Sequence, residues 1–182
     1  MKIFILEDRE ENIIAAKETL CGHELLIARN YQDGERLLRT EKPTLAIIDI
    51  HFPMEEGGKE EALGQKFKEE VLFEKEFPVP TITMSAGYHG SSPSTDIHFE
   101  IKFQSGGRIG PSRVYTTSGD TKDKPATWKK AADALLNHRN PSMCCYIAAM
   151  ETLSNPMKWN EAFELTLNAL KDITGNMKNI SG

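Results

Sequence analysis

The strongest indication of the fold is the stretch Leu45-Ala46-Ile47-Ile48-Asp49-Ile50-His51-Phe52-Pro53. Four apolar residues lead directly into an aspartate, and a loop with a proline follows. A run that is apolar on both faces is typical of a buried central strand in a parallel sheet. Asp49 then lies at the carboxyl end of that strand, which is the edge where open α/β sheets bind their ligands.

The chain on both sides of this strand alternates between strand-type and helix-type patterns. Short apolar runs at 3–6, 24–28 and 81–84 predict three further strands. Between them, Asp8 can cap a first helix, Asn30 or Asp33 starts a second, and a charged helix over 59–75 follows. That third helix is expected to bury Leu63, Phe67 and Val71. The β-α-β-α-β-α-β order predicts a three-layer α/β fold with a parallel sheet of flavodoxin-like strand order.

The regularity ends after residue 86. Residues 87–112 are rich in Gly, Ser and Pro, and the alternating stretch 97–103 predicts a half-exposed strand. With 114–117 it is expected to form a hairpin across Gly106-Gly107, in place of a fourth helix. Helical patterns return at 125–138, 143–153 and 156–174. We therefore expect a domain over 1–138, with 87–123 as an atypical insertion or hairpin, and a helical C-terminal extension over 139–182.

Composition excludes several classes of protein. Hydrophobic content of 39% and charged content of 27% in 182 residues are those of a soluble globular protein. A net charge of -5 without a basic cluster argues against nucleic-acid and anionic-membrane binding. Cys21, Cys144 and Cys145 fit neither a disulfide framework nor a zinc site. The N-terminal apolar run is too short for a signal peptide, so the expected location is the cytoplasm.

The first and third strands are neighbours in this strand order, so Glu7, Asp8 and Asp49 are expected to share one pocket. Three adjacent carboxylates raise one another's pKa unless a cation lies among them. Mg²⁺ suits such a site because it takes oxygen ligands and leaves room for phosphate oxygens. A carboxylate beside Mg²⁺ can attack phosphorus and form an aspartyl phosphate. A hydroxyl and a lysine nearby would help to hold the incoming phosphoryl group.

These residues carry a resemblance to a known family. Ile3-Phe4-Ile5-Leu6-Glu7-Asp8, Ile47-Ile48-Asp49-Ile50-His51-Phe52-Pro53, Thr83-Met84-Ser85-Ala86 and Lys124-Pro125 resemble motifs of the response-regulator receiver (CheY-like) domains of two-component phosphorelays. The resemblance covers about residues 1–138. It implies that Asp49 accepts a phosphoryl group from a histidine kinase or phosphotransfer protein and that the chain then signals through an output protein.

The same resemblance implies roles for the other site residues. Glu7, Asp8, Asp49 and the backbone carbonyl of His51 would hold Mg²⁺. Ser85 would be the switch hydroxyl, and Lys124 would pair with the phosphoryl group. Lys102, at the end of the alternating stretch, is a rival for this lysine because the polar run 118–123 separates Lys124 from any predicted strand.

Simpler interpretations exist for each residue taken alone. Asp8 can be a helix cap, Asp49 an ordinary loop aspartate, Ser85 a turn hydroxyl and His51 a solvated loop histidine. The joint spacing of Glu7, Asp8, Asp49 and Ser85 favours the acidic pocket over these interpretations.

Two other functions remain open. The chain could be a degenerate receiver that binds a partner without phosphorylation, as the unusual 87–123 region indicates. It could also be a Mg²⁺-dependent phosphohydrolase that uses Asp49. His51 stands against this, because many aspartate-based phosphatases have a second aspartate two residues after the first. We expect a signalling phosphoacceptor rather than an enzyme, and a tail that packs on the sheet's helices or forms a homodimer.

Overall fold

The computed structural model of the chain describes residues 2–41, 43, 45–73, 79–102, 108–115 and 118–136. Its internal contacts divide the chain into two units, Met1–Ala132 and Asp133–Gly182. The described residues lie in the first unit, except for 133–136 at the start of the second. The predicted helices of the tail, 139–182, lie outside the described residues.

The first half of the chain alternates strands and helices as predicted. Its elements are β1 (Lys2–Leu6), α1 (Glu10–Thr19), β2 (Glu24–Ala28), α2 (Tyr31–Thr40), β3 (Leu45–Asp49), β4 (His51–Pro53), β5 (Glu60–Ala62), α3 (Gly64–Phe67) and the π-helix η1 (Lys68–Leu72). The second half is formed by β6 (Thr81–His89), β7 (Ser92–Lys102), β8 (Arg108–Tyr115) and α4 (Pro125–Leu136).

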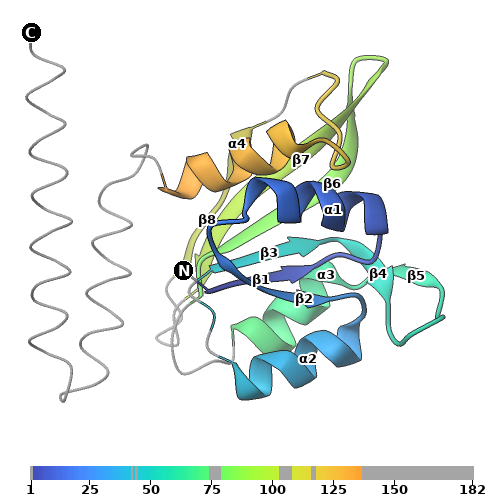
Figure 1. Cartoon of the computed structure of the whole chain (residues 1–182), viewed down its shortest axis with the longest axis vertical. Helices are drawn as coiled ribbons and strands as arrows, with labels where there is room; N and C mark the ends of the chain where they lie inside the picture. The colour runs from blue at the N-terminus through green and yellow to red at the C-terminus, as the bar shows by residue number, and fades with distance from the viewer. Residues whose placement is uncertain are drawn as a thin grey trace, which may run out of the picture. The chain divides into compact units, whose positions relative to one another are not determined.

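One six-stranded sheet has the order β2-β1-β3-β6-β7-β8. Its first four strands are parallel, whereas β7 and β8 are antiparallel to their neighbours. Helices α1 and α4 lie on one face, and α2 and α3 lie on the other (Figure 1). The prediction of an α/β fold with a parallel central sheet is therefore confirmed, and the order of the parallel strands is compatible with a flavodoxin-like fold.

The central strands are buried because both of their faces are covered. Every residue of β3 is buried, and the apolar residues of β1 from Ile3 to Leu6 are fully inaccessible. On the α2 and α3 side, the Phe67 ring packs against Phe4, Tyr31 and Phe52, with ring centroids 6.0, 5.1 and 6.1 Å away. Burial of a phenylalanine side chain contributes about 1.5–3 kcal/mol. Phe67 therefore anchors the short α3 to the sheet.

The predicted helix over 59–75 is wrong in its first part. Residues 60–62 form β5 instead, which pairs with β4 in a separate two-stranded sheet. The helix begins at Gly64, whose backbone N–H donates to the Ile50 carbonyl at 2.9 Å. A Cβ atom at Gly64 would lie 2.6 Å from the Asp49 carbonyl oxygen. Only glycine allows the chain to return this close to the end of β3, and this return delays the helix.

The region after β6 also differs from the prediction. The fourth strand does not end near residue 85 but continues to His89, and β7 pairs with β6 along nine residues, from Thr81 with Glu100 to His89 with Ser92. The turn contains Gly90, with φ of 66°, a backbone conformation that glycine adopts without steric cost. β7 then pairs with β8 in antiparallel orientation, which agrees in outline with the predicted hairpin of 97–103 with 114–117. Gly106 and Gly107 lie outside the described residues.

Candidate functional site

The three predicted carboxylates come together at the carboxyl ends of β1 and β3. Leu6 pairs with Ile48, so Glu7 and Asp8 emerge beside Asp49. One oxygen from each of the three side chains lies within 4.8 Å of the others. Glu7 and Asp49 are buried, with exposed fractions of 1% and 7%. Asp8 is not the cap of α1, because the N-cap residue is Arg9 and no side chain caps this helix.

A buried lysine bridges two of these carboxylates. Lys122 Nζ donates to Glu7 Oε2 at 2.9 Å and also pairs with Asp49 Oδ2. The lysine is 7% exposed and comes from the loop between β8 and α4. Its ammonium group is a cation inside the acidic cluster, so it offsets part of the repulsion between the carboxylates.

Further hydrogen bonds hold the acidic groups in place. Asn12 Nδ2 donates to Glu7 Oε1 at 2.9 Å, and the Ile50 backbone N–H donates to Asp49 Oδ1 at 2.6 Å. Among the described residues, no hydrogen-bond partner exists for the buried Asp8 Oδ1. A buried polar atom without a partner is costly. Asp8 thus has an oxygen available for a ligand that the protein itself does not supply.

The environment disfavours negative charge at two of these carboxyl groups. Burial raises the pKa of Glu7 above its ordinary value of 4.5 and outweighs the attraction of Lys122, while the nearby Asp49 raises it further. Burial also raises the pKa of Asp8, and the charge of Glu60 on β5 adds to this effect. A cation bound among these oxygens would oppose both effects.

The three carboxylates could hold a metal ion such as Mg²⁺. All three protein groups offer carboxylate oxygens, the ligands that this ion prefers, and Mg²⁺ commonly keeps several waters when it binds through few carboxylates. Oxygens bound to one Mg²⁺ ion lie at most about 4 Å apart, so the cluster oxygens, within 4.8 Å of one another, would need at most a small contraction to bind it together. The unpartnered Asp8 oxygen is compatible with a bound cation at this position. His51, whose carbonyl was predicted as a further ligand, begins β4 two residues after Asp49, and its side chain is exposed.

The lysine beside Asp49 is neither of the two predicted candidates. Lys124 is exposed, and its Nζ donates to the Gly119 carbonyl at 2.5 Å. Lys102 ends β7, which runs antiparallel to β6, and therefore lies at the amino-terminal edge of the parallel strands, away from Asp49. Lys122 takes the position at the carboxylates because the turn before α4 places it, and not Lys124, over the end of β3.

Ser85 lies at the carboxyl edge of the parallel strands, as predicted, but it does not line the cavity beside the acidic cluster. It follows Met84, which pairs with Asp49, and it is partly exposed. Alternation along β6 places it on the same face as Thr83, whose hydroxyl contacts Lys68 at 3.2 Å. The next two residues, Ala86 and Gly87, line the cavity beside the acidic cluster.

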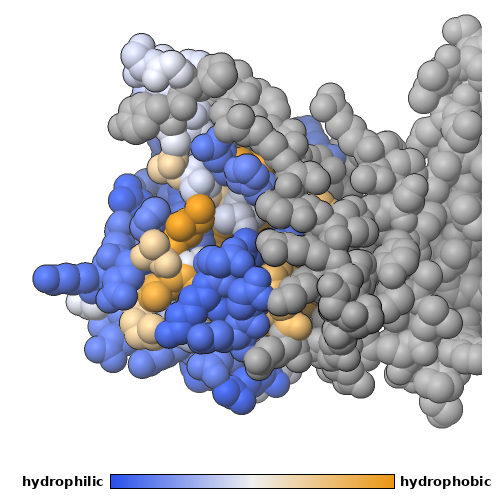
Figure 2. Space-filling view, turned by 180° about the vertical axis from the view of Figure 1, so that it is seen from behind, coloured by the Kyte–Doolittle hydropathy of each residue, from blue (hydrophilic) through white to orange (hydrophobic). Residues whose placement is uncertain are grey.

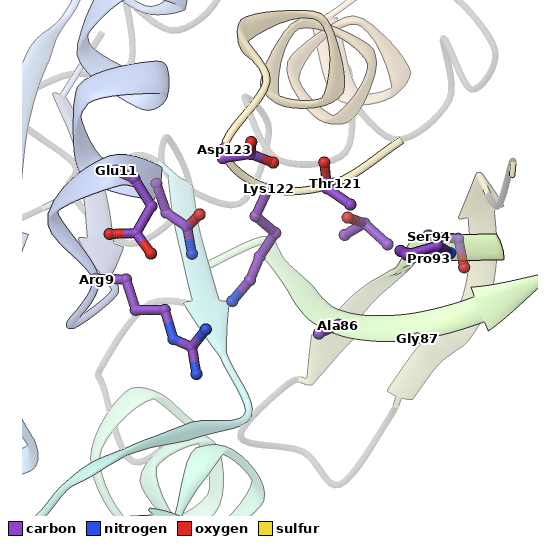
Figure 3. A pocket seen from close by; sticks show the side chains of 11 residues that line it. Arg9, Glu11, Ala86, Gly87, Pro93, Ser94, Thr121, Lys122 and Asp123 are labelled. Atoms are coloured by element: carbon purple, nitrogen blue, oxygen red, sulfur yellow. The ribbon is translucent and has the colours of Figure 1, made fainter. Parts of the chain in front are cut away.

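That cavity has a volume of about 320 Å³ and opens between α1, the end of β6, the start of β7 and the Lys122 loop. Figure 3 shows Arg9 and Glu11 on one side, Pro93 and Ser94 on the other, and the Lys122 side chain extending toward the sheet. Lys122 lines the cavity, and its ammonium group lies in the acidic cluster. Glu7, Asp8 and Asp49 do not themselves line the cavity, so Lys122 connects the cavity with the cluster.

Two residues that contact the acidic cluster were not predicted from the sequence. Lys122 lies in the polar run 118–123, which has no periodicity that distinguishes one lysine from another. Asn12 lies on α1, one turn after the acidic pair. An amide at this spacing is a weak signal for a hydrogen bond to the carboxylate of Glu7.

Comparisons of the chain with models of known families, with curated proteins and with solved structures found no match. Within the described part of the chain, no helix has the length and apolar character needed to cross a membrane. Where Figure 2 is coloured, the surface seen from behind is mostly hydrophilic, with a few hydrophobic residues between the polar ones. Because these comparisons found no match, a function can be proposed only from the geometry of the acidic site.

Proposed function

We propose that the chain is a receiver-type phosphoacceptor, in which Asp49 takes a phosphoryl group in a Mg²⁺-dependent reaction. The observation that carries this proposal is the cluster of Glu7, Asp8 and Asp49, with oxygens within 4.8 Å of one another and a buried lysine bridging two of them. A nucleophilic carboxylate, two further acidic groups and a cation at the carboxyl edge of a parallel sheet suit phosphoryl transfer.

In the proposed reaction, a carboxylate oxygen of Asp49 forms a bond to phosphorus while the bond from phosphorus to the donor breaks. With a phosphohistidine donor the imidazole nitrogen keeps the bonding pair and regains a proton from solvent. Mg²⁺, bound through Glu7, Asp8 and Asp49, would neutralise charge on the phosphoryl oxygens. The Lys122 ammonium would move from its carboxylate partners to a phosphoryl oxygen, and it takes the role predicted for Lys124.

The partners follow from this chemistry. The donor would be a histidine kinase or a phosphotransfer protein in the cytoplasm, and the phosphorylated surface would be recognised by an output protein. Ser85, at the same edge of the sheet, remains our candidate for a hydroxyl that responds to the phosphoryl group.

A degenerate receiver is the second candidate, and one observation favours it. Lys122 already pairs with two of the three carboxylates, so the site has an internal cation without a metal. In this case the protein would bind a partner through its surface, and phosphate would not regulate it. A phosphohydrolase using Asp49 remains a third possibility, which turnover of a generic phosphomonoester would reveal.

The deciding experiment is the intact mass of the full chain after incubation with acetyl phosphate and Mg²⁺. The wild type should gain one phosphoryl group, whereas Asp49→Asn and a sample with chelator should gain none. An adduct on Asp49→Asn would place the modification elsewhere and contradict the assignment. Absence of both an adduct and Mg²⁺ binding in the wild type would favour the interaction module.

A further inference from the structure

The backbone of Lys122 is held by a tryptophan. Trp128 lies on α4, is 1% exposed, and its indole Nε1–H donates to the Lys122 carbonyl oxygen at 2.6 Å. The lysine that enters the acidic cluster and the carbonyl that receives the indole bond thus belong to one residue. Trp128 has no contact of its own with the carboxylates among the hydrogen bonds of the described residues.

Hydrogen bonds hold the loop that carries Lys122 on both sides. On its α4 side, the Thr127 backbone N–H donates to the Lys124 carbonyl at 3.0 Å. On its sheet side, Thr95 Oγ1 donates to the Asp120 carbonyl at 2.7 Å, and the Gly119 backbone N–H donates to the Pro93 carbonyl at 2.7 Å. The loop therefore links the acidic cluster to the start of β7.

We propose that Trp128 is a positioning residue for Lys122. This inference rests on the proposed function. Lysine has a flexible four-carbon stem, so a fixed Cα position is needed to direct the ammonium group between two carboxylates. The indole bond supplies that fixed point, because breaking it would leave the buried Lys122 carbonyl without this donor.

A tryptophan that only fills the core would behave differently from a positioning residue. Trp128→Phe keeps an aromatic ring but removes the N–H donor, so packing is largely preserved while the bond to Lys122 is lost. Tyr31→Phe is the matched control, because it removes one hydrogen bond from a buried aromatic residue, to Glu70 at 2.8 Å, on the other face of the sheet.

The first test is spectroscopic and needs neither metal nor phosphate. Trp128 and Trp159 are the two tryptophans of the chain, so W159F leaves one indole N–H signal in a ¹H–¹⁵N NMR spectrum of the full chain. In that background, Lys122→Met and Asp49→Asn should shift the Trp128 indole signal, whereas Tyr31→Phe should not. If neither Lys122→Met nor Asp49→Asn shifts the indole signal, the link between Trp128 and the acidic cluster is refuted.

The second test separates positioning from folding. Trp128→Phe should lower the rate of Asp49 phosphorylation by acetyl phosphate about tenfold, the size of effect expected from losing one buried hydrogen bond. Its affinity for Mg²⁺ should not fall, because the carboxylates are intact, and Tyr31→Phe should retain both properties. A parallel loss of rate and Mg²⁺ affinity, or no loss of rate, would overturn the positioning role. If the wild type is not phosphorylated but the indole signal responds, only the proposed function fails.

Discussion

Replacing Lys122 by methionine tests the electrostatic account of the site most directly. The substitution keeps a side chain of similar length but removes the cation that pairs with Glu7 Oε2 at 2.9 Å and with Asp49 Oδ2. All three residues are at most 7% exposed, so solvent screens the lost interaction only weakly. Removing one partner of a buried ion pair costs about 3–5 kcal/mol.

For a chain of this size, about 1 kcal/mol changes the melting temperature by roughly 2–4 °C. Lys122→Met should therefore unfold roughly 6–20 °C below the wild type at neutral pH without metal, as measured by circular dichroism. Lys124→Met is the control, because this neighbouring lysine is exposed and lies outside the cluster. Its free energy of unfolding should stay within about 0.5 kcal/mol of the wild type.

Mg²⁺ should reverse much of the loss. A metal at about 100 times its dissociation constant adds about 2.7 kcal/mol of stability. The effect should be larger in Lys122→Met than in the wild type, because the ammonium no longer competes for Glu7 and Asp49. The reasoning is refuted if Lys122→Met is as stable as Lys124→Met, or if Mg²⁺ stabilises neither the variant nor the wild type.

Three further predictions concern pH and packing. Burial raises the pKa of Glu7 above 4.5, so the folded state binds the Glu7 proton more tightly than the unfolded chain does. The stability that this proton contributes is therefore lost as pH rises from about 4.5 through the raised pKa. Urea titrations of the metal-free protein should show this decline in stability, and Glu7→Gln should abolish the decline. Gly64→Ala should lower the free energy of unfolding by about 1–3 kcal/mol, measured by thermal unfolding, because its Cβ would lie 2.6 Å from the backbone carbonyl oxygen at the end of β3. Gly22→Ala is the control and should show no such steric cost, because no atom lies within 4 Å of a Cβ at that position. Lys68→Met should destabilise the protein by about 3 kcal/mol, because Lys68 forms a buried ion pair with Glu100 at 3.0 Å. Adding Glu100→Gln should recover part of this loss. If the destabilisations of the two single variants simply add in the double variant, the pairing is contradicted.

The first half of the sheet and the acidic cluster were predictable from the sequence. Residues 45–48 are apolar on both faces, a pattern that is typical of a strand covered by helices on both sides. Once that strand was recognised, the parallel order brought Glu7 and Asp8 to the end of β3. These conclusions follow from local periodicity and from the rule that successive parallel strands end at one edge.

The lysine at the acidic cluster and the fold of the second half were not predictable from local sequence patterns. Lys122 is separated from Glu7 by 115 positions in the chain, and no local pattern distinguishes it from Lys124. The position of the loop depends on the Trp128 bond and on the tethers to β7. The late start of α3 depends on the close approach of Gly64 to the end of β3. Each of these features is a contact between segments distant in sequence, and such contacts are selected by packing and charge in three dimensions.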